Sequence, residues 1–279
     1  MTTITAPSPR TRIENHVVAD AITMLRRNLL HMVRYPALSL FTILGPVVAL
    51  LLFVFVFGGT LGAGLPGIES GGDPADARAA YLAYVMPGIL AITIAGTAGG
   101  TAITVSMDMT EGITARFRTM AISRASVLAG HVLGNTLQAL IAVALVLGVG
   151  VLVGFRPTAA PLDWLALLGI LALIAYAINW IGVGMGMQAK SVESASNLPL
   201  LVTLLPLLGS GFVPTDTMPA GLAWFAEYQP FTPFIETIRG LLLGTPLGSN
   251  PLLAAVWCVA LVIVGIIWSL ALYERKSVR

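Results

Sequence analysis

Six long apolar runs constrain the fold of this 279-residue chain more than any other feature of its sequence. About 20 consecutive apolar residues are enough to cross a lipid bilayer as one helix. Hydrophobic residues make up 57% of the chain and charged residues only 10%, a balance far from that of a water-soluble domain. The sequence therefore predicts an all-α membrane protein with a single membrane domain and six transmembrane helices, at 37–57, 84–106, 127–153, 163–187, 196–213 and 250–273.

The orientation of these spans follows from the placement of Lys and Arg, which concentrate on the cytoplasmic side of membrane proteins. If both ends of the chain lie on one side, that side receives every Lys and Arg except Arg78, Arg156 and Arg239. We therefore expect both termini in the cytoplasm.

The chain before the first span divides into two parts. We expect residues 1–13 to form a disordered cytoplasmic tail. In residues 14–34, apolar side chains such as Val18, Ile22 and Leu25 recur at helical spacing among basic ones. This pattern predicts an amphipathic helix that lies in the cytoplasmic membrane interface. A topology anchor without any other role is the alternative.

Two segments on the outer side differ in character. Residues 58–83 are rich in glycine and indicate a flexible outer loop without a recognisable site. Residues 214–245 are too apolar for an ordinary loop, and four prolines divide them into short pieces. We expect short re-entrant helices in the outer leaflet there. Glu236 and Arg239 stand at i and i+3 and are spaced to form an ion pair, either functional or merely solvated.

Uncharged polar residues lie inside the spans. Thr93, Thr97, Thr101 and Thr104 recur at a spacing that stacks four hydroxyl groups on one helix face. This stripe, together with Thr203 in a later span, predicts the border of a pathway for an amphipathic solute. Alternatively, each hydroxyl bonds back to the preceding helical turn and the face only packs.

Glycines four residues apart also recur in the spans, at Gly96 and Gly100 and at Gly182 and Gly186. Small residues at this spacing let helix backbones approach closely. We expect packing within the chain at these positions, and an interface between two copies of the chain is the alternative.

The sequence contains no recognisable catalytic or metal-binding site. The nearest match to a phosphate-binding loop is GMGMQAKS at 184–191, which has Ala189 where the second glycine is required. The histidines are expected at cytoplasmic or interfacial positions, so none can activate Ser210 near the opposite face. We therefore expect no enzyme activity, metal or cofactor in this chain, and any ATP must act on a separate partner.

The stretch 107–130 is a charged amphipathic island between two spans, and the topology places it in the cytoplasm. Glu111, Arg116 and Arg118 surround a group of apolar residues, a composition suited to a protein interface. The apolar group consists of Ile113, Phe117 and Met120. An ordinary cytoplasmic loop that carries topology charges is the alternative.

The island segment GITARFRTMAISRASVLAG, the outer segment MPAGLAWFAEYQPFTPFIETIRGLLLG and the six-span order resemble the membrane subunit of ABC type 2 exporters. The nearest branch is the daunorubicin/doxorubicin-resistance permeases of actinobacteria, and the resemblance extends from Glu14 to Lys276. It implies a permease domain over residues 14–279 in a bacterial cytoplasmic membrane. It also implies a half-transporter, in which two copies of this chain assemble with two ATP-binding subunits that carry ATP and Mg.

The resemblance implies roles for particular segments. The island becomes a coupling helix that docks on the ATPase through Glu111, Gly112, Arg116, Phe117, Arg118 and Met120. The spans 84–106 and 196–213 line the pathway, so the threonines named above become its candidate residues. The re-entrant helices shape an outer gate, with candidates at Phe212, Pro230, Pro233, Glu236 and Arg239. Related permeases often carry more carboxylates at the start of the coupling segment than Asp108 and Glu111 here.

We therefore expect a permease subunit that moves a hydrophobic or amphipathic, drug- or antibiotic-like compound out of the cell. Its expected partners are a second copy of itself, two ATP-binding subunits and membrane lipid, and no nucleic acid. One alternative has the same architecture but exports a lipid or a lipid-linked glycan. The other is a membrane scaffold that transports nothing.

Overall fold

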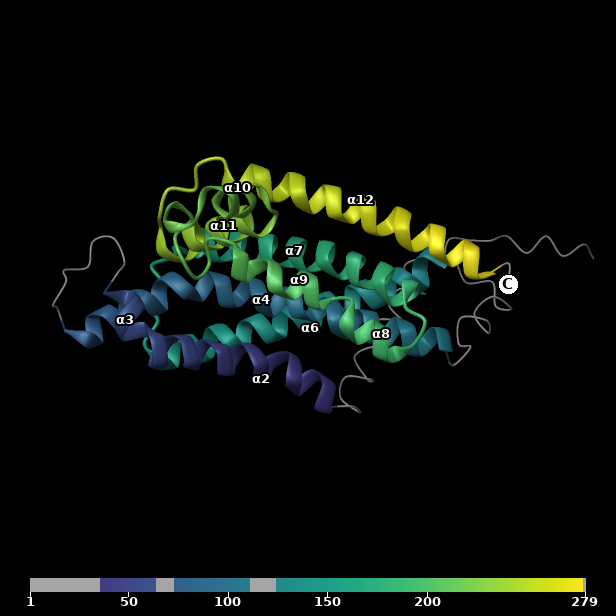
Figure 1. The fold of residues 1–279 in the computed structure, drawn as a ribbon, viewed down its shortest axis with the longest axis horizontal. Coiled ribbons are helices and arrows are strands. Elements are labelled where there is room, and N and C mark those ends of the chain that lie inside the picture. Colours follow the sequence, from purple (N-terminus) through teal and green to yellow (C-terminus); the bar gives the residue numbers. More distant parts are fainter. Residues whose placement is uncertain (1–35, 64–72, 111–123, 278–279) are drawn as a thin grey trace, which may run out of the picture.

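The computed structural model describes residues 36–63, 73–110 and 124–277, and every regular element within these ranges is a helix. Five helical segments are long and apolar enough to cross a membrane, which confirms an all-α membrane protein. They are α2 (Pro36–Leu52) continued by a π-helical turn η1 (Phe53–Phe57) and α3 (Gly58–Gly62), then α4 (Pro74–Thr110), α6 (Arg124–Val153), α7 (Pro161–Gln188) and α12 (Asn250–Ser277). They lie side by side along the long axis of the molecule (Figure 1).

The fifth expected span, 196–213, does not form one continuous helix. It consists of α8 (Val192–Asn197), α9 (Leu200–Leu204) and the 3-10 turn η2 (Leu205–Leu208). Pro199 and Pro206 stand at the two breaks, where each lacks the N–H that a continuous helix would need. The broken segment still runs along the bundle from one end toward the other. The start of α2 and the end of α12 both lie toward the same end of the bundle (Figure 1).

The helix α4 begins ten residues before the predicted start of its span. Asp73 caps it, because its side-chain Oδ1 accepts a 2.8 Å hydrogen bond from the N–H of Ala75. Pro74 occupies the first helical position, where a missing N–H costs nothing. Part of the expected outer loop at 58–83 is therefore helical, since α3 covers 58–62 and α4 covers 74–83.

The helices α4 and α7 form the centre of the bundle. In the most apolar stretch of each helix, 67% of α4 and 61% of α7 is buried inside the protein. The corresponding share is 17–33% for the segments that begin with α2, α6 and α12. Their close contact depends on Gly182 and Gly186, where a Cβ atom would lie 2.8 Å from the carbonyl oxygen of Ala98 and 2.5 Å from that of Ala102. These two glycines therefore pack within the chain, as expected from their spacing.

One end of the bundle is covered by short helices. There η3 (Thr215–Thr217), α10 (Ala220–Tyr228) and α11 (Phe231–Leu243) lie beside the start of α12 (Figure 1). The sequence predicted short helices in this region, and their position in the outer leaflet stays a prediction. We call this the α10/α11 end, and the end at which α4 finishes and α6 begins the opposite end.

Candidate functional site

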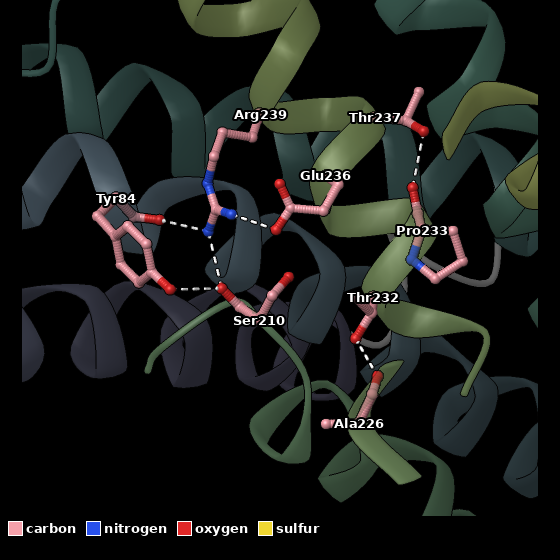
Figure 2. Close-up of polar contacts among 8 residues, drawn as sticks. All are labelled: Tyr84, Ser210, Ala226, Thr232, Pro233, Glu236, Thr237 and Arg239. Atoms are coloured by element: carbon pink, nitrogen blue, oxygen red, sulfur yellow. Dashed lines mark hydrogen bonds and ion pairs between the residues drawn. The ribbon is translucent and has the colours of Figure 1, made fainter. Parts of the chain in front are cut away.

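The densest group of polar contacts at the α10/α11 end is centred on Arg239 of α11 (Figure 2). Its guanidinium pairs with the Glu236 carboxylate and donates hydrogen bonds to the carbonyl oxygens of Tyr84, at 3.2 Å, and Ser210, at 2.8 Å. The Tyr84 hydroxyl donates to the same Ser210 oxygen at 3.0 Å. The guanidinium carbon also lies 4.4 Å from the centre of the Tyr84 ring, within the range of a cation–π contact. We call these four residues the Arg239 cluster.

The Arg239 cluster is not a solvated surface pair. The Arg239 side chain is 12% exposed and that of Glu236 is 28% exposed. An ion pair at this depth gives up much of its hydration, so its additional hydrogen bonds to backbone carbonyls are needed to compensate. The cluster therefore ties α11, α4 and the turn at Ser210 together at one point.

Glycines bring these segments close enough for the contacts. A Cβ atom on Gly88 would lie 2.8 Å from the carbonyl oxygen of Gly211, and one on Gly211 would lie 2.8 Å from the Cα of Gly88. The two backbones can approach this closely because both positions are glycine. The hydrogen-bond ladder of α4 is also interrupted next to this point, because Pro87 has no N–H.

The other expected outer-gate residues surround the cluster. Phe212 is buried, and its ring centre lies 4.8 Å from that of Phe53. Pro230 precedes the first residue of α11, and Pro233 lies in its first turn, where its carbonyl accepts a 2.7 Å hydrogen bond from the Thr237 hydroxyl. The structure thus brings the five expected gate residues to the same end of the bundle. Their role in gating stays a prediction.

The threonines of the expected pathway do not share one environment. Thr93, Thr97 and Thr101 are buried, and each donates its hydroxyl proton within its own helix. The hydroxyl oxygens of Thr97 and Thr101 also lie 3.2 Å and 2.7 Å from Oδ1 of Asn179 on α7. Thr97 and Thr101 therefore join α4 to α7, and the pathway role of all three threonines stays a prediction.

Thr104 and Thr203 are only partly buried. Both hydroxyls also bond to their own helices, Thr104 to Gly100 and Thr101 at 3.0 Å each, and Thr203 to Pro199 at 3.1 Å. Their exposed surfaces remain available to a neighbouring molecule, and their pathway role stays a prediction.

The island between α4 and α6 is described only at its two edges. The expected ATPase contacts lie outside the described residues, namely Glu111, Gly112, Arg116, Phe117, Arg118 and Met120. Residues 1–35, with the expected interfacial helix, also lie outside them. At the edges, Nε2 of His131 on α6 lies 3.0 Å from Oδ2 of Asp108 on α4, and both side chains are at least 85% buried. Sequence reasoning missed this pair.

Sequence reasoning also missed the roles of Tyr84 and Ser210. The i, i+3 spacing of Glu236 and Arg239 was a local signal, whereas Tyr84 and Ser210 are 155 and 29 residues away from Arg239. The Gly209–Gly211 sequence around Ser210 was the only available hint, since glycines often mark a close backbone approach.

Comparisons with known proteins agree with this architecture. Residues 20–243 match the ABC-2 type transporter family. The daunorubicin resistance ABC transporter permease protein DrrB1 of Streptomyces coeruleorubidus is 27% identical over 248 residues, which cover 88% of this chain and 80% of that protein. The probable doxorubicin resistance ABC transporter permease protein DrrC of Mycobacterium tuberculosis is 24% identical over 63% of this chain and 64% of its own length. The chain belongs to the ABC-2 type transporter family.

Proposed function

We propose that this chain is the permease subunit of an ATP-driven exporter that moves a hydrophobic or amphipathic compound out of a bacterial cell. The observation that carries the proposal is the family match over residues 20–243, together with relatives named for daunorubicin and doxorubicin resistance. The sequence supports a separate energy source, because its nearest approach to a phosphate-binding loop lacks the required second glycine.

ATP binding and hydrolysis take place, in this proposal, on two separate ATP-binding subunits. They contact the segment 111–123 in the cytoplasm through Glu111, Gly112, Arg116, Phe117, Arg118 and Met120. The end of α4 and the start of α6 flank this segment, and they lie at the same end of the bundle as the start of α2 and the end of α12 (Figure 1). This shared position supports the assignment. The positive-inside rule then puts that end, and both termini, in the cytoplasm.

The compound passes between two copies of the chain, along a face of α4. A strip of α4 remains partly exposed although most of this helix is buried. We call it the α4 strip, and it contains Ile92, Gly96, Gly100, Ile103 and Thr104. A Cβ atom at Gly96 or Gly100 would meet no described atom within 4 Å, which leaves room for a second copy or a solute. The helix α9, with Thr203, packs beside α4 and completes this face.

The α10/α11 end serves as the outer gate. The Arg239 cluster supports this role, because it joins α4 to the re-entrant helix α11 through contacts that a movement of either helix would break. When ATP closes the partner subunits, the force on the coupling segment passes along α4 to this cluster, as a rigid-body switch.

The test is export by the permease expressed together with its ATP-binding subunit. We expect cells with both subunits to accumulate less doxorubicin than cells with the permease alone, and Phe117→Ala with Arg118→Ala to abolish the difference. Accumulation that never responds to the pair would argue against drug export. Movement of a labelled lipid by both subunits in proteoliposomes would then favour the lipid-exporting alternative. Failure to recover an ATPase with the permease would favour the scaffold.

A further inference from the structure

Two buried polar side chains at the α10/α11 end, one of them in the Arg239 cluster, have no hydrogen-bond partner among the described residues. Gln229 is 4% exposed, and neither its amide nitrogen nor its amide oxygen is bonded. Ser210 is 6% exposed, and its hydroxyl is also unbonded, although its carbonyl oxygen accepts two hydrogen bonds. Burying such groups without a partner costs free energy, so a group that bonds them would be bound favourably.

Both side chains belong to the same small region. Gln229 directly follows α10, and its Nε2 lies 3.1 Å from the position that a Cβ atom would take on Gly209. A side chain at 209 would therefore press against the amide, and glycine leaves more room for it. Ser210 is the next residue in the chain, so the Gln229 amide and Ser210 both belong to the surroundings of the turn Gly209–Gly211.

Among the described residues, no neighbouring polar group forms a hydrogen bond with these atoms, although Nε of Arg239 is likewise buried and unbonded there. The hydroxyl of Thr232, also 3.1 Å from the same Cβ position, already donates to the carbonyl oxygen of Ala226 (Figure 2). Arg239 and Glu236 pair with each other and cancel their charges. An apolar atom lies close to the same turn, because Cδ1 of Ile235 would lie 3.5 Å and 3.1 Å from Cβ atoms at Gly209 and Gly211.

We propose that Gln229 and Ser210 form a binding point for an uncharged hydrogen-bonding group of the exported compound, such as a neighbouring carbonyl and hydroxyl. The amide supplies donors and an acceptor and the hydroxyl supplies one of each, while Ile235 contacts the apolar body of the compound. The point is closed in this structure, so a solute reaches it when the turn separates from α11. The inference rests on the proposed function and names the chemistry that its outer gate recognises.

The test uses the permease with its ATP-binding subunit in proteoliposomes, with doxorubicin as the probe. The doxorubicin concentration that half-saturates ATP hydrolysis and transport is measured for Gln229→Leu and Ser210→Ala. We expect it to rise about three- to tenfold in each variant, because each loses a hydrogen bond to the compound. The maximal rate stays close to that of the wild type, since neither substitution touches the coupling segment.

Thr237→Val is the matched control, since it also replaces a buried polar group, one whose hydroxyl is bonded within its own helix at 2.7 Å. We expect its half-saturating concentration to be unchanged. A melting temperature of Gln229→Leu equal to or above that of the wild type supports the inference, because the substitution removes two unbonded atoms. A fall in both melting temperature and maximal rate, with unchanged half-saturation, would instead indicate a structural role and overturn it.

The failure of this inference differs from the failure of the proposed function. Normal stimulation of the wild type by doxorubicin, with unchanged half-saturation in both variants, would overturn the binding point alone. No stimulation of the wild type would overturn the proposed drug export and the binding point with it.

Discussion

Arg239 holds three segments of the chain together through one guanidinium group. Replacing it with Met keeps the length of the side chain but leaves the partly exposed Glu236 carboxylate without its partner and removes the donor to Tyr84 and Ser210. We expect Arg239→Met to lower the free energy of unfolding by about 1–3 kcal/mol, because a partly buried charge and two carbonyl oxygens lose their hydrogen-bond partner. Thermal unfolding of the purified permease in detergent measures the change.

Arg156→Met is the matched control for this prediction. Arg156 is exposed, and within the described part of the chain its hydrogen bonds go to the nearby carbonyls of Val151 and Phe155, at 3.1 Å and 3.3 Å. We expect its loss to change stability by less than about 0.5 kcal/mol. Equal melting temperatures for the two variants would contradict the role of the Arg239 cluster.

Glu236 and Arg239 also show how far sequence reasoning reaches at the scale of single residues. Their spacing of three is a property of one helix, so the pair was predicted and the structure contains it. Its burial, and its bonds to Tyr84 and Ser210, depend on how α4, the turn and α11 meet. A local sequence pattern does not predict how these three segments pack together. The same holds for the pair of Asp108 and His131, which joins two different helices.

At the scale of elements, close packing of α4 on α7 depends on glycine. In Gly186→Ala, the new Cβ atom would lie 2.5 Å from the carbonyl oxygen and 2.9 Å from the Cα of Ala102, so the two helices must move apart. We expect a loss of about 1–3 kcal/mol of unfolding free energy, as for other overpacked cores. Detergent unfolding measured side by side with the wild type tests this.

Gly100→Ala provides the comparison, because a Cβ atom there meets no described atom within 4 Å. Alanine also favours a helix over glycine by up to about 1 kcal/mol, so we expect this variant to be as stable as the wild type or more stable. If Gly186→Ala proved as stable as Gly100→Ala, the close contact between α4 and α7 would not limit stability.

A second pair of elements, α4 and α6, meets through Asp108 and His131 beside the proposed coupling segment. If the partner subunits act on that segment as we propose, we expect this contact to make the two helices move together. We expect His131→Gln to leave ATP hydrolysis of the complex intact but to reduce the compound exported per ATP several-fold. Parallel measurement of both rates in proteoliposomes gives the ratio.

Thr110→Val is the control for the helix end, because among the described residues its hydroxyl bonds to Ser106 and Met107 of its own helix, at 3.1 Å and 2.9 Å. We expect its transport to remain coupled. An unchanged ratio in His131→Gln would show that the contact plays no part in transmission.

The elements themselves were largely predictable, with two instructive exceptions. Apolar periodicity located five spans, because lipid and core demand apolar side chains along whole helices. Hydropathy alone missed the start of α4, since residues 74–83 are mixed in character, although Asp73 and Pro74 together signal a helix start. It also joined α8, α9 and η2 into one span although Pro199 and Pro206 lie within the run.

For the molecule as a whole, the α4 strip distinguishes a dimer that pairs through α4 from one that pairs elsewhere. The chain has a single cysteine, Cys258, which is buried, so Cys258→Ser gives a background without thiols. In that background we expect Gly100→Cys to form a disulfide-linked dimer on oxidation in native membranes. A disulfide requires Cα atoms about 4–7 Å apart, so the link reports direct apposition of two α4 helices.

Val259→Cys in the same background is the matched control, since Val259 is 55% exposed on α12, a helix to which the proposed dimer gives no partner. We expect it to remain monomeric on denaturing gels after the same oxidation. A dimer band from Val259→Cys without one from Gly100→Cys would move the interface to α12 and separate it from the α4 strip. The pathway would then have to run elsewhere, because the partly exposed glycines of α4 would face lipid instead of a second copy.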